Sequence, residues 1–293
     1  MKPGFIRTAA LLLAMLLGGL LPQAYVFKEK IPWLVAGMLF IVFLQTRLVR
    51  GALRPGHFLL LAVNVAMGFA GWGLGTVVGG ADVGRAAFFA GITPTATAAP
   101  VIMSFLGGRV EYVVAAFLLT NLAIVALLPA LLPLVLGQPS PELFQQVLGT
   151  VVLVVLVPMG LAWGVRTVHA RAAAWPHRLR NVSFGAWLAA VFLAMANASQ
   201  FLRTQPVRPA VLGRIAVVTA LVCAANFALG RVVGGRHFGR EGSQALGQKN
   251  TALTIALAIH YAGPLVALGP TFYVVWHNLW NSWQLHRAAR RSR

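Results

Sequence analysis

Long runs of apolar residues recur along the chain, separated by short stretches that carry charge, proline or glycine. Each run has about 20 residues, the length an α-helix needs to cross the ~30 Å hydrocarbon core of a membrane. Strands of a membrane barrel would be shorter and would alternate in polarity, so the runs predict helices. The ten predicted spans are 5–27, 32–48, 57–79, 84–106, 111–136, 144–166, 180–202, 209–233, 243–262 and 264–286.

No long hydrophilic segment separates these runs, so the sequence predicts a single transmembrane domain over residues 1–293. The first run, AALLLAMLLGGLL, also fits the apolar part of a signal peptide; because many spans follow it, we interpret it as the first membrane helix. The spans divide into two predicted repeats, 1–136 and 144–287, followed by a basic tail at 288–293. Five spans per repeat is an odd number, which inverts the second repeat relative to the first.

The fourth and ninth spans hold matching positions in the two repeats. Each opens with a polar stretch whose residues disfavour a helix. These stretches are GITPTATAAP (91–100) and EGSQALGQKNT (241–251). Unwound backbone at membrane depth survives only where it lines a cavity or packs in protein, and paired interruptions in inverted halves indicate a transporter's binding site. The predicted fold is therefore an all-α membrane protein with ten transmembrane helices, of which the fourth and ninth are broken.

Composition supports this fold class and limits the kinds of molecule that the protein is expected to bind. Of the 293 residues, 59% are hydrophobic and only 10% are charged, against about 25% charged in an ordinary soluble domain. The net charge of +19 does not indicate a nucleic-acid partner, because the basic residues sit in short loops, where they orient the chain and contact anionic lipid. The single cysteine, Cys223, excludes a disulfide within the chain and is expected to be a small buried residue.

Most of the 24 basic residues fall, with ten spans, on the side of the membrane that also holds both termini. Basic loops favour the cytoplasmic side. We therefore expect cytoplasmic termini and a location in the bacterial inner membrane. Lys249 is the exception, since it lies within an apolar run instead of a loop.

Two stretches resemble the bile acid:sodium symporter family, and the resemblance extends over most of the chain. They are PTATAAPVIMSFLGGRV (94–110) and GQKNTALTIALAIHYAGPLVALGPTFYVVWHN (247–278). The first is similar to the family's proline–glycine–glycine–threonine–alanine–serine–asparagine motif. The second is similar to its glycine–x–glutamine–asparagine–serine/threonine motif and to the tryptophan–histidine–asparagine of its last helix. The resemblance implies ten helices in inverted repeats, with two broken helices that cross at mid-membrane.

The resemblance also implies sodium ligands, and most of those positions carry unsuitable residues here. The family's serine–asparagine pair falls on Ala99 and Pro100, its glutamate on Ala245, and its glutamine on Lys249. Two hydroxyl ligands fall near residues 113 and 117, where the chain has valine and phenylalanine. Only Asn64 is left to stand in for an amide ligand. Sodium, a hard cation, prefers oxygen ligands, so a sodium cofactor is doubtful and no other cofactor is expected.

By the same resemblance, the substrate cavity is expected to include Thr97, Asn250, His277 and Asn278, and Lys249 is a further candidate because its charge would attract an anion. Each is also a polar group within or beside an apolar run, where it needs a hydrogen-bond partner. Asn121 takes the position in the fifth span that Asn278 takes in the tenth, and either amide could serve only to join helices.

Lys249 admits several interpretations. A lysine at the centre of a membrane helix costs about 2.5–3.5 kcal/mol, so it is expected to face a partner or a wet cavity. No carboxylate is near it in sequence, except Glu241 if the chain folds back. The ammonium could replace the family's sodium as a tethered cation, attract the substrate's anionic group, or exchange a proton during transport. Alternatively, the side chain reaches the membrane surface.

The leading functional hypothesis is a sodium-independent carrier of a small or amphipathic organic anion. The alternatives are a sodium-coupled symporter of the same family and a channel-like or receptor-like protein that kept the fold. An enzyme using His260 or His277 with Ser243 or Cys223 is not expected, because no acid is placed to orient either histidine. A metal site is not expected either, because His260 is interpreted as a packing residue and ligands at metal spacing are lacking.

Overall fold

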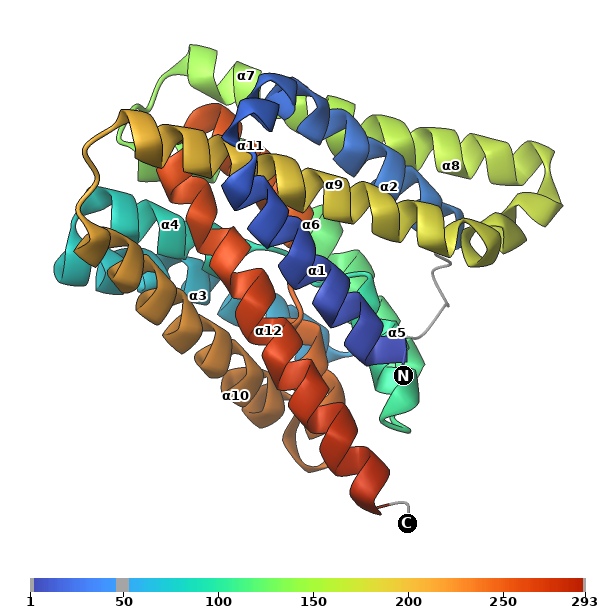
Figure 1. The fold of residues 1–293 in the computed structure, drawn as a ribbon. Helices are drawn as coiled ribbons and strands as arrows, with labels where there is room; N and C mark the ends of the chain where they lie inside the picture. Colours follow the sequence, from blue (N-terminus) through green and yellow to red (C-terminus); the bar gives the residue numbers. More distant parts are fainter. Residues whose placement is uncertain (1–2, 46–52, 292–293) are drawn as a thin grey trace.

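The computed structural model describes residues 3–45 and 53–291, and nearly all of them are helical (Figure 1). This part of the chain contains no strand. Its α-helices are α1 (Pro3–Leu20), α2 (Ile31–Gln45), α3 (Pro55–Gly79), α4 (Ala81–Ile92), α5 (Ala98–Phe105), α6 (Val110–Leu136), α7 (Pro141–Val151), α8 (Val157–Val168), α9 (Trp175–Thr204), α10 (Pro209–Gly247), α11 (Thr251–Tyr261) and α12 (Pro264–Arg291). Shorter 3₁₀ helices, η1 (Pro22–Lys30) and η3 (Ala170–Ala174), precede α2 and α9, and a π-helical turn, η2 (Val152–Leu156), joins α7 to α8.

Five helical segments in the described residues are long and apolar enough to cross a membrane: Pro55–Gly79, Val110–Leu136, Pro141–Val168, Asn181–Thr204 and Pro209–Gly247. A sixth is obtained if Ala9–Leu20 and Pro22–Leu44, which meet at a bend of 112°, are taken as one span. The protein is therefore an all-α membrane protein. The fourth and ninth predicted spans fall on interrupted helices, and the tenth falls on α12, which has 28 residues but is not among the helices apolar enough to cross a membrane, so the count of ten stays a prediction.

Two groups of helices are visible in the ribbon (Figure 1). In one group, α9 packs along α1 and α2, and α8 packs against α2. In the other, α3 and α4 form a close pair that α10 and α12 cover. The short helix α11 lies between them and contacts α2 and α9 as well as α4 and α12.

Glycines on α3 explain the close approach of α3 and α4. A Cβ atom added at Gly75 would lie 2.6 Å from the carbonyl oxygen of Val83, and one at Gly71 would lie 3.0 Å from that of Ala87. Larger side chains would force the two helices apart, as in small-residue packing between membrane helices generally. Gly73 faces open space and takes no part in this contact.

The predicted break in the fourth span is observed between α4, which ends at Ile92, and α5, which begins at Ala98. Pro94 has no backbone N–H to continue the helix, whereas Pro100 falls in the first turn of α5, where that N–H is not needed. The break in the ninth span is shorter than predicted. The structure keeps Glu241–Gly247 helical as the end of α10 and confines the break to residues 248–250.

The glycines at 242 and 247 were expected to interrupt the helix, and that expectation was wrong for a steric reason. A Cβ atom at Gly242 would lie 2.3 Å from the carbonyl oxygen of Gly230, and one at Gly247 would lie 2.3 Å from the Phe227 ring. The two glycines therefore let the end of α10 pack against its own first part. The chain reverses between these parts where Gly235 (φ 59°) and Phe238 leave helical geometry.

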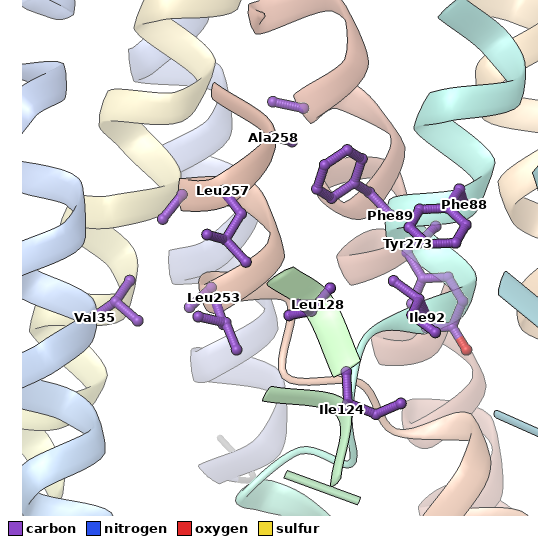
Figure 2. Close-up of a cluster of buried hydrophobic side chains, with 14 of the residues drawn as sticks. Val35, Phe88, Phe89, Ile92, Ile124, Leu128, Leu253, Leu257, Ala258 and Tyr273 are labelled. Carbon is purple, nitrogen blue, oxygen red and sulfur yellow. The ribbon is translucent and has the colours of Figure 1, made fainter. Parts of the chain in front are cut away.

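An apolar core surrounds the breaks. Figure 2 shows its side chains converging from five helices. The labelled residues are Val35 of α2, Phe88, Phe89 and Ile92 of α4, Ile124 and Leu128 of α6, Leu253, Leu257 and Ala258 of α11, and Tyr273 of α12. This core holds the two polar breaks in a water-poor environment.

Candidate functional site

The two helix breaks lie against each other, and the backbone N–H and carbonyl groups of one form hydrogen bonds with those of the other. The N–H of Ala96 donates to the carbonyl of Gln248 (2.8 Å), and the N–H of Asn250 donates to the carbonyl of Pro94 (2.8 Å). Thr95 and Lys249 thereby form an isolated antiparallel bridge. Buried backbone groups are costly when unpaired, so this pairing explains how two breaks persist inside the protein.

Hydroxyl and amide groups complete the hydrogen bonding of the first break. The Thr95 hydroxyl donates to the carbonyl of Ala245 (2.6 Å), and its backbone N–H donates to the Thr120 hydroxyl (3.2 Å). Asn121 Nδ2 donates to the Thr95 carbonyl (2.9 Å). The hydroxyls of Thr93 and Thr254 share a hydrogen bond of 2.8 Å, which links α11 to the same break. Asn121 therefore supports the break from α6.

Lys249 lies where the two breaks meet, a place called here the crossing. Its side chain is 1% exposed, and its Nζ donates to Asn64 Oδ1 on α3. Asn64 Nδ2 in turn donates to the carbonyl of Ile92, the last residue of α4 (2.9 Å). The C-terminal end of a helix carries partial negative charge. The hydrogen bonds through Asn64 therefore link the positively charged Lys249 ammonium to the negative end of α4. The alternative in which Lys249 reaches the membrane surface is wrong.

No carboxylate in residues 3–45 or 53–291 lies within 4.0 Å of the Lys249 ammonium. Glu241, the one acid that chain reversal could have brought to it, instead accepts a hydrogen bond from the backbone N–H of Arg109 (2.9 Å). Glu241 stands at the start of the helical segment that ends at Gly247, two turns away from the break. The site therefore holds a buried cationic group with an amide as its hydrogen-bond partner.

The predicted substrate-cavity residues are only partly brought together. Thr97 and Asn250 are half-buried and lie in the two paired breaks, just before α5 and α11. His277 packs edge-to-face on Tyr273 (5.7 Å between ring centroids), and the Tyr273 hydroxyl donates to the carbonyl of Gly247 (3.0 Å), so His277 borders the second break. Asn278 Nδ2 donates to Val274 of its own helix (2.7 Å).

Three of the positions at which the resemblance implies sodium ligands lie in one apolar cluster. Ala99, Ala245 and Val113 are buried together with Leu60 and four other residues: Met103, Tyr112, Ala116 and Leu246. Pro100 is half-buried in the first turn of α5, and Asn64 is engaged by Lys249. Carbon-lined surfaces supply no ligand for a hard cation.

The chain matches no protein-family model and no curated protein. The site therefore has to be interpreted from its own residues and geometry.

Two amide pairs were missed by sequence reasoning. Gln248 Nε2 donates to Asn281 Oδ1, and Gln244 Nε2 donates to Gln284 Oε1, so the second break is joined to α12. A signal was present in the sequence. His277, Asn281 and Gln284 stand at i, i+4 and i+7 of α12, the spacing that places residues on one helix face. Tyr273 extends the same face by one turn.

Four buried polar atoms have no hydrogen-bond partner in the described part of the chain: Asn226 Oδ1, Gln244 Oε1, Asn250 Nδ2 and His277 Nδ1. All four belong to α10, the second break or α12. Buried polar groups are normally paired, and exceptions call for an explanation such as a ligand or water.

The other chemistry considered from sequence has less support in the geometry. Ser243 Oγ donates to the carbonyl of Phe227 (2.7 Å), and His260 is exposed and contacts the Tyr261 ring, in contrast to the buried packing role expected of it. Cys223 is a buried free thiol. No group of three or more His, Cys, Asp or Glu in the described residues is placed to hold a metal ion.

Proposed function

We propose that the protein is a secondary transporter of a small or amphipathic organic anion, working by alternating access without sodium. One observation carries the proposal: Lys249 is buried at the meeting point of two helix breaks and has no carboxylate partner among the described residues. Breaks of this kind lie at the substrate sites of secondary transporters. A buried cation without an acidic partner favours an anionic ligand.

The ammonium takes the electrostatic role that a bound alkali ion has in the family that the sequence resembles. Its link through Asn64 to the carbonyl end of α4 supports this assignment. The apolar cluster of Ala99, Val113 and Ala245 supports it further, because these three side chains offer sodium no oxygen ligand. Besides this tethering role, Lys249 attracting the substrate's anionic group and Lys249 exchanging a proton remain two separate outcomes for experiment.

We further propose ten spans arranged as two inverted five-helix repeats, with both termini cytoplasmic in a bacterial inner membrane. The order of elements supports the repeat. Each half has a long helix, a turn with a positive-φ glycine (Gly80, Gly235), a short helix, a break and a second short helix. A further positive-φ glycine (Gly107, Gly263) and a long helix follow in each half.

For alternating access we propose that α3–α6 and α10–α12, which carry the crossing, move as one body against α1, α2 and α7–α9. The packing of α9 on α1 and α2, and of α12 on α4 and α10, supports this division. His277, Asn250 and Thr97 then face the substrate from the moving side of the site.

The test is a thermal-stability screen of the purified protein against organic acids, bile acids and sterol-like anions. The compound that stabilises the protein most is then followed into proteoliposomes, with sodium or choline outside and at two pH values. We expect uptake that is equal in sodium and choline and that is lost in Lys249→Met. Sodium-dependent uptake would contradict the proposal, and stabilisation without any uptake would show a receptor-like protein instead of a carrier.

A further inference from the structure

A second polar feature lies away from the crossing, where the α5–α6 turn meets the reversal inside α10. It is a hollow of about 720 Å³. Its lining residues, named here the arginine hollow, are Gly107, Gly108, Arg109, Arg231, Val232, Gly235, Arg236, His237, Gly239, Arg240 and Glu241. None of its lining residues belongs to the bridge of Thr95 and Lys249 or to Asn64, so the hollow is separate from the crossing.

Positive charge dominates the arginine hollow. Four arginines line it, and its only acid, Glu241, is 7% exposed and already accepts the backbone N–H of Arg109. In the parts of the chain that are described, no carboxylate lies within 4.0 Å of any of the four guanidinium groups. Such a concentration of unneutralised guanidinium favours an anion, and guanidinium matches phosphate geometry especially well.

Two of these arginines are held by the protein. Arg240 donates to the carbonyl of Leu106, and the Arg109 guanidinium stacks over the Phe238 ring at 4.7 Å. Phe238 is itself stacked on Tyr112, with ring centroids 4.5 Å apart and 13° between the planes. The α5–α6 turn and the α10 reversal are thereby joined into one framework around the hollow.

The other two arginines make no such contacts. Arg231 and Arg236 are exposed, and neither guanidinium has a hydrogen bond, ion pair or ring contact within the described residues. They lie on opposite sides of Gly235, whose positive φ turns the chain back on itself. Both side chains are therefore available to a ligand in the hollow.

Apolar surface adjoins the arginines. Val232 lines the hollow and is 74% exposed, and Phe105, at the end of α5 just before it, is 67% exposed. A soluble phosphate has no apolar part that could contact this surface, whereas a phospholipid carries acyl chains as well as a phosphate. Basic pockets between membrane helices bind anionic headgroups in this way.

We propose that the arginine hollow binds the phosphate of an anionic phospholipid, with Arg231 and Arg236 as its principal donors. Basic loops also orient membrane chains, but that effect requires no hollow and no framework that fixes two arginines around two free ones. The proposal depends on the membrane location of the protein and not on the transport function.

Native mass spectrometry and titration of the purified full-length protein in detergent test the proposal. The probes are dioctanoyl-phosphatidylglycerol, dioctanoyl-phosphatidylcholine and the soluble sn-glycerol 1-phosphate. The variant is Arg231→Gln/Arg236→Gln. The matched control is Arg171→Gln/Arg178→Gln, which removes the same charge from two exposed arginines outside the hollow. Unfolding temperatures without lipid check that both variants fold, and Arg236→Gln alone is the substitute if the double variant does not.

Each basic residue beside an anionic lipid contributes about fivefold to binding. We expect phosphatidylglycerol to bind the variant about 25-fold more weakly, or about fivefold for the single substitution, while the control binds normally and phosphatidylcholine binds weakly to all. Equal weakening in variant and control would show a general surface-charge effect and overturn the proposal. Glycerol phosphate binding as tightly as the lipid, with the same loss in the variant, would show a site for soluble phosphate and also overturn it.

Discussion

The two helix breaks that meet at the crossing differ in chemistry. The first, between α4 and α5, contains Thr93 and Thr95, whose hydroxyls bond to Thr254 and Ala245, while the Thr95 backbone bonds to Thr120 and Asn121. The second, between α10 and α11, carries the ammonium and lies among buried polar atoms that have no partner in the described residues. Thr93 and Thr95 of the first break are thus hydrogen-bonded, whereas the second break adjoins buried polar atoms that are unpaired within the described residues.

This difference separates residues expected to stabilise the fold from residues expected to bind a ligand. A fully bonded polar network makes its region rigid, while a partly bonded one costs free energy that a ligand recovers on binding. We therefore expect substitutions in the first break to affect folding and substitutions beside the second to affect binding. Substitution of Lys249 should affect both folding and binding, since its ammonium is buried and hydrogen-bonded but has no carboxylate within 4.0 Å among the described residues.

The largest effect is expected when Lys249 loses its amide partner. Asn64→Leu leaves a buried ammonium without its hydrogen-bond acceptor, which should lower the free energy of unfolding by about 3 kcal/mol or more, since an unpaired charged group costs more than a neutral one. Chemical denaturation in detergent micelles measures this loss. The double variant Asn64→Leu/Lys249→Met removes both groups and should recover most of the stability. If the double variant were as unstable as the sum of the single ones, the two side chains would not be coupled.

A smaller loss is expected in the first break. Thr95→Val keeps the shape of the side chain but deprives the Ala245 carbonyl of the Thr95 donor, while Thr120 keeps its bonds to Ala116 and to the Thr95 N–H. Unfolding should therefore become easier by about 1–3 kcal/mol. Thr76→Val is a matched control, because the Thr76 hydroxyl bonds only to Trp72 of its own helix at an exposed position. Anion affinity, measured by titration, should stay unchanged in Thr95→Val. If Thr95→Val lost anion affinity but kept the stability of the wild-type protein, the first break would have a binding role instead of a structural one.

The smallest effect on folding is expected beside the second break. His277→Phe replaces a buried ring whose Nδ1 has no hydrogen-bond partner among the described residues, so stability should change by less than about 1 kcal/mol. Binding of the stabilising anion should weaken because a donor or acceptor facing it is gone. Trp276→Phe provides a contrast, since the Trp276 indole already donates to Ala216 and Thr219. Large destabilisation by His277→Phe with normal anion affinity would assign His277 a structural role.

The sequence predicts those parts of this molecule that local chemistry determines. Apolar periodicity and length locate the long helices, and Pro94 with its neighbouring threonines locates the first break. The extent of the second break was less predictable. Gly242 and Gly247 disfavour helix in isolation, but in the fold they permit contact with Gly230 and Phe227 and remain helical.

Tertiary partners of polar groups were harder to predict. The placement of Lys249 in an apolar run and of Asn64 in a predicted membrane helix is visible in the sequence, but their hydrogen bond joins residues far apart in the chain. Glu241 was considered as a partner for Lys249 because the two are close in sequence, yet the helix between them carries Glu241 to Arg109. The amide pairs of Gln244 and Gln248 with α12 depend likewise on how two helices pack.

The central claim is that the Lys249 ammonium replaces a bound alkali ion at the crossing. Its most direct test is the unfolding temperature of the purified wild-type protein in sodium chloride and in choline chloride at equal ionic strength. Anything that binds only the folded state raises that temperature with increasing concentration. We predict the same unfolding temperature in both salts at every concentration. A rise that is specific to sodium and saturates with its concentration would contradict the claim.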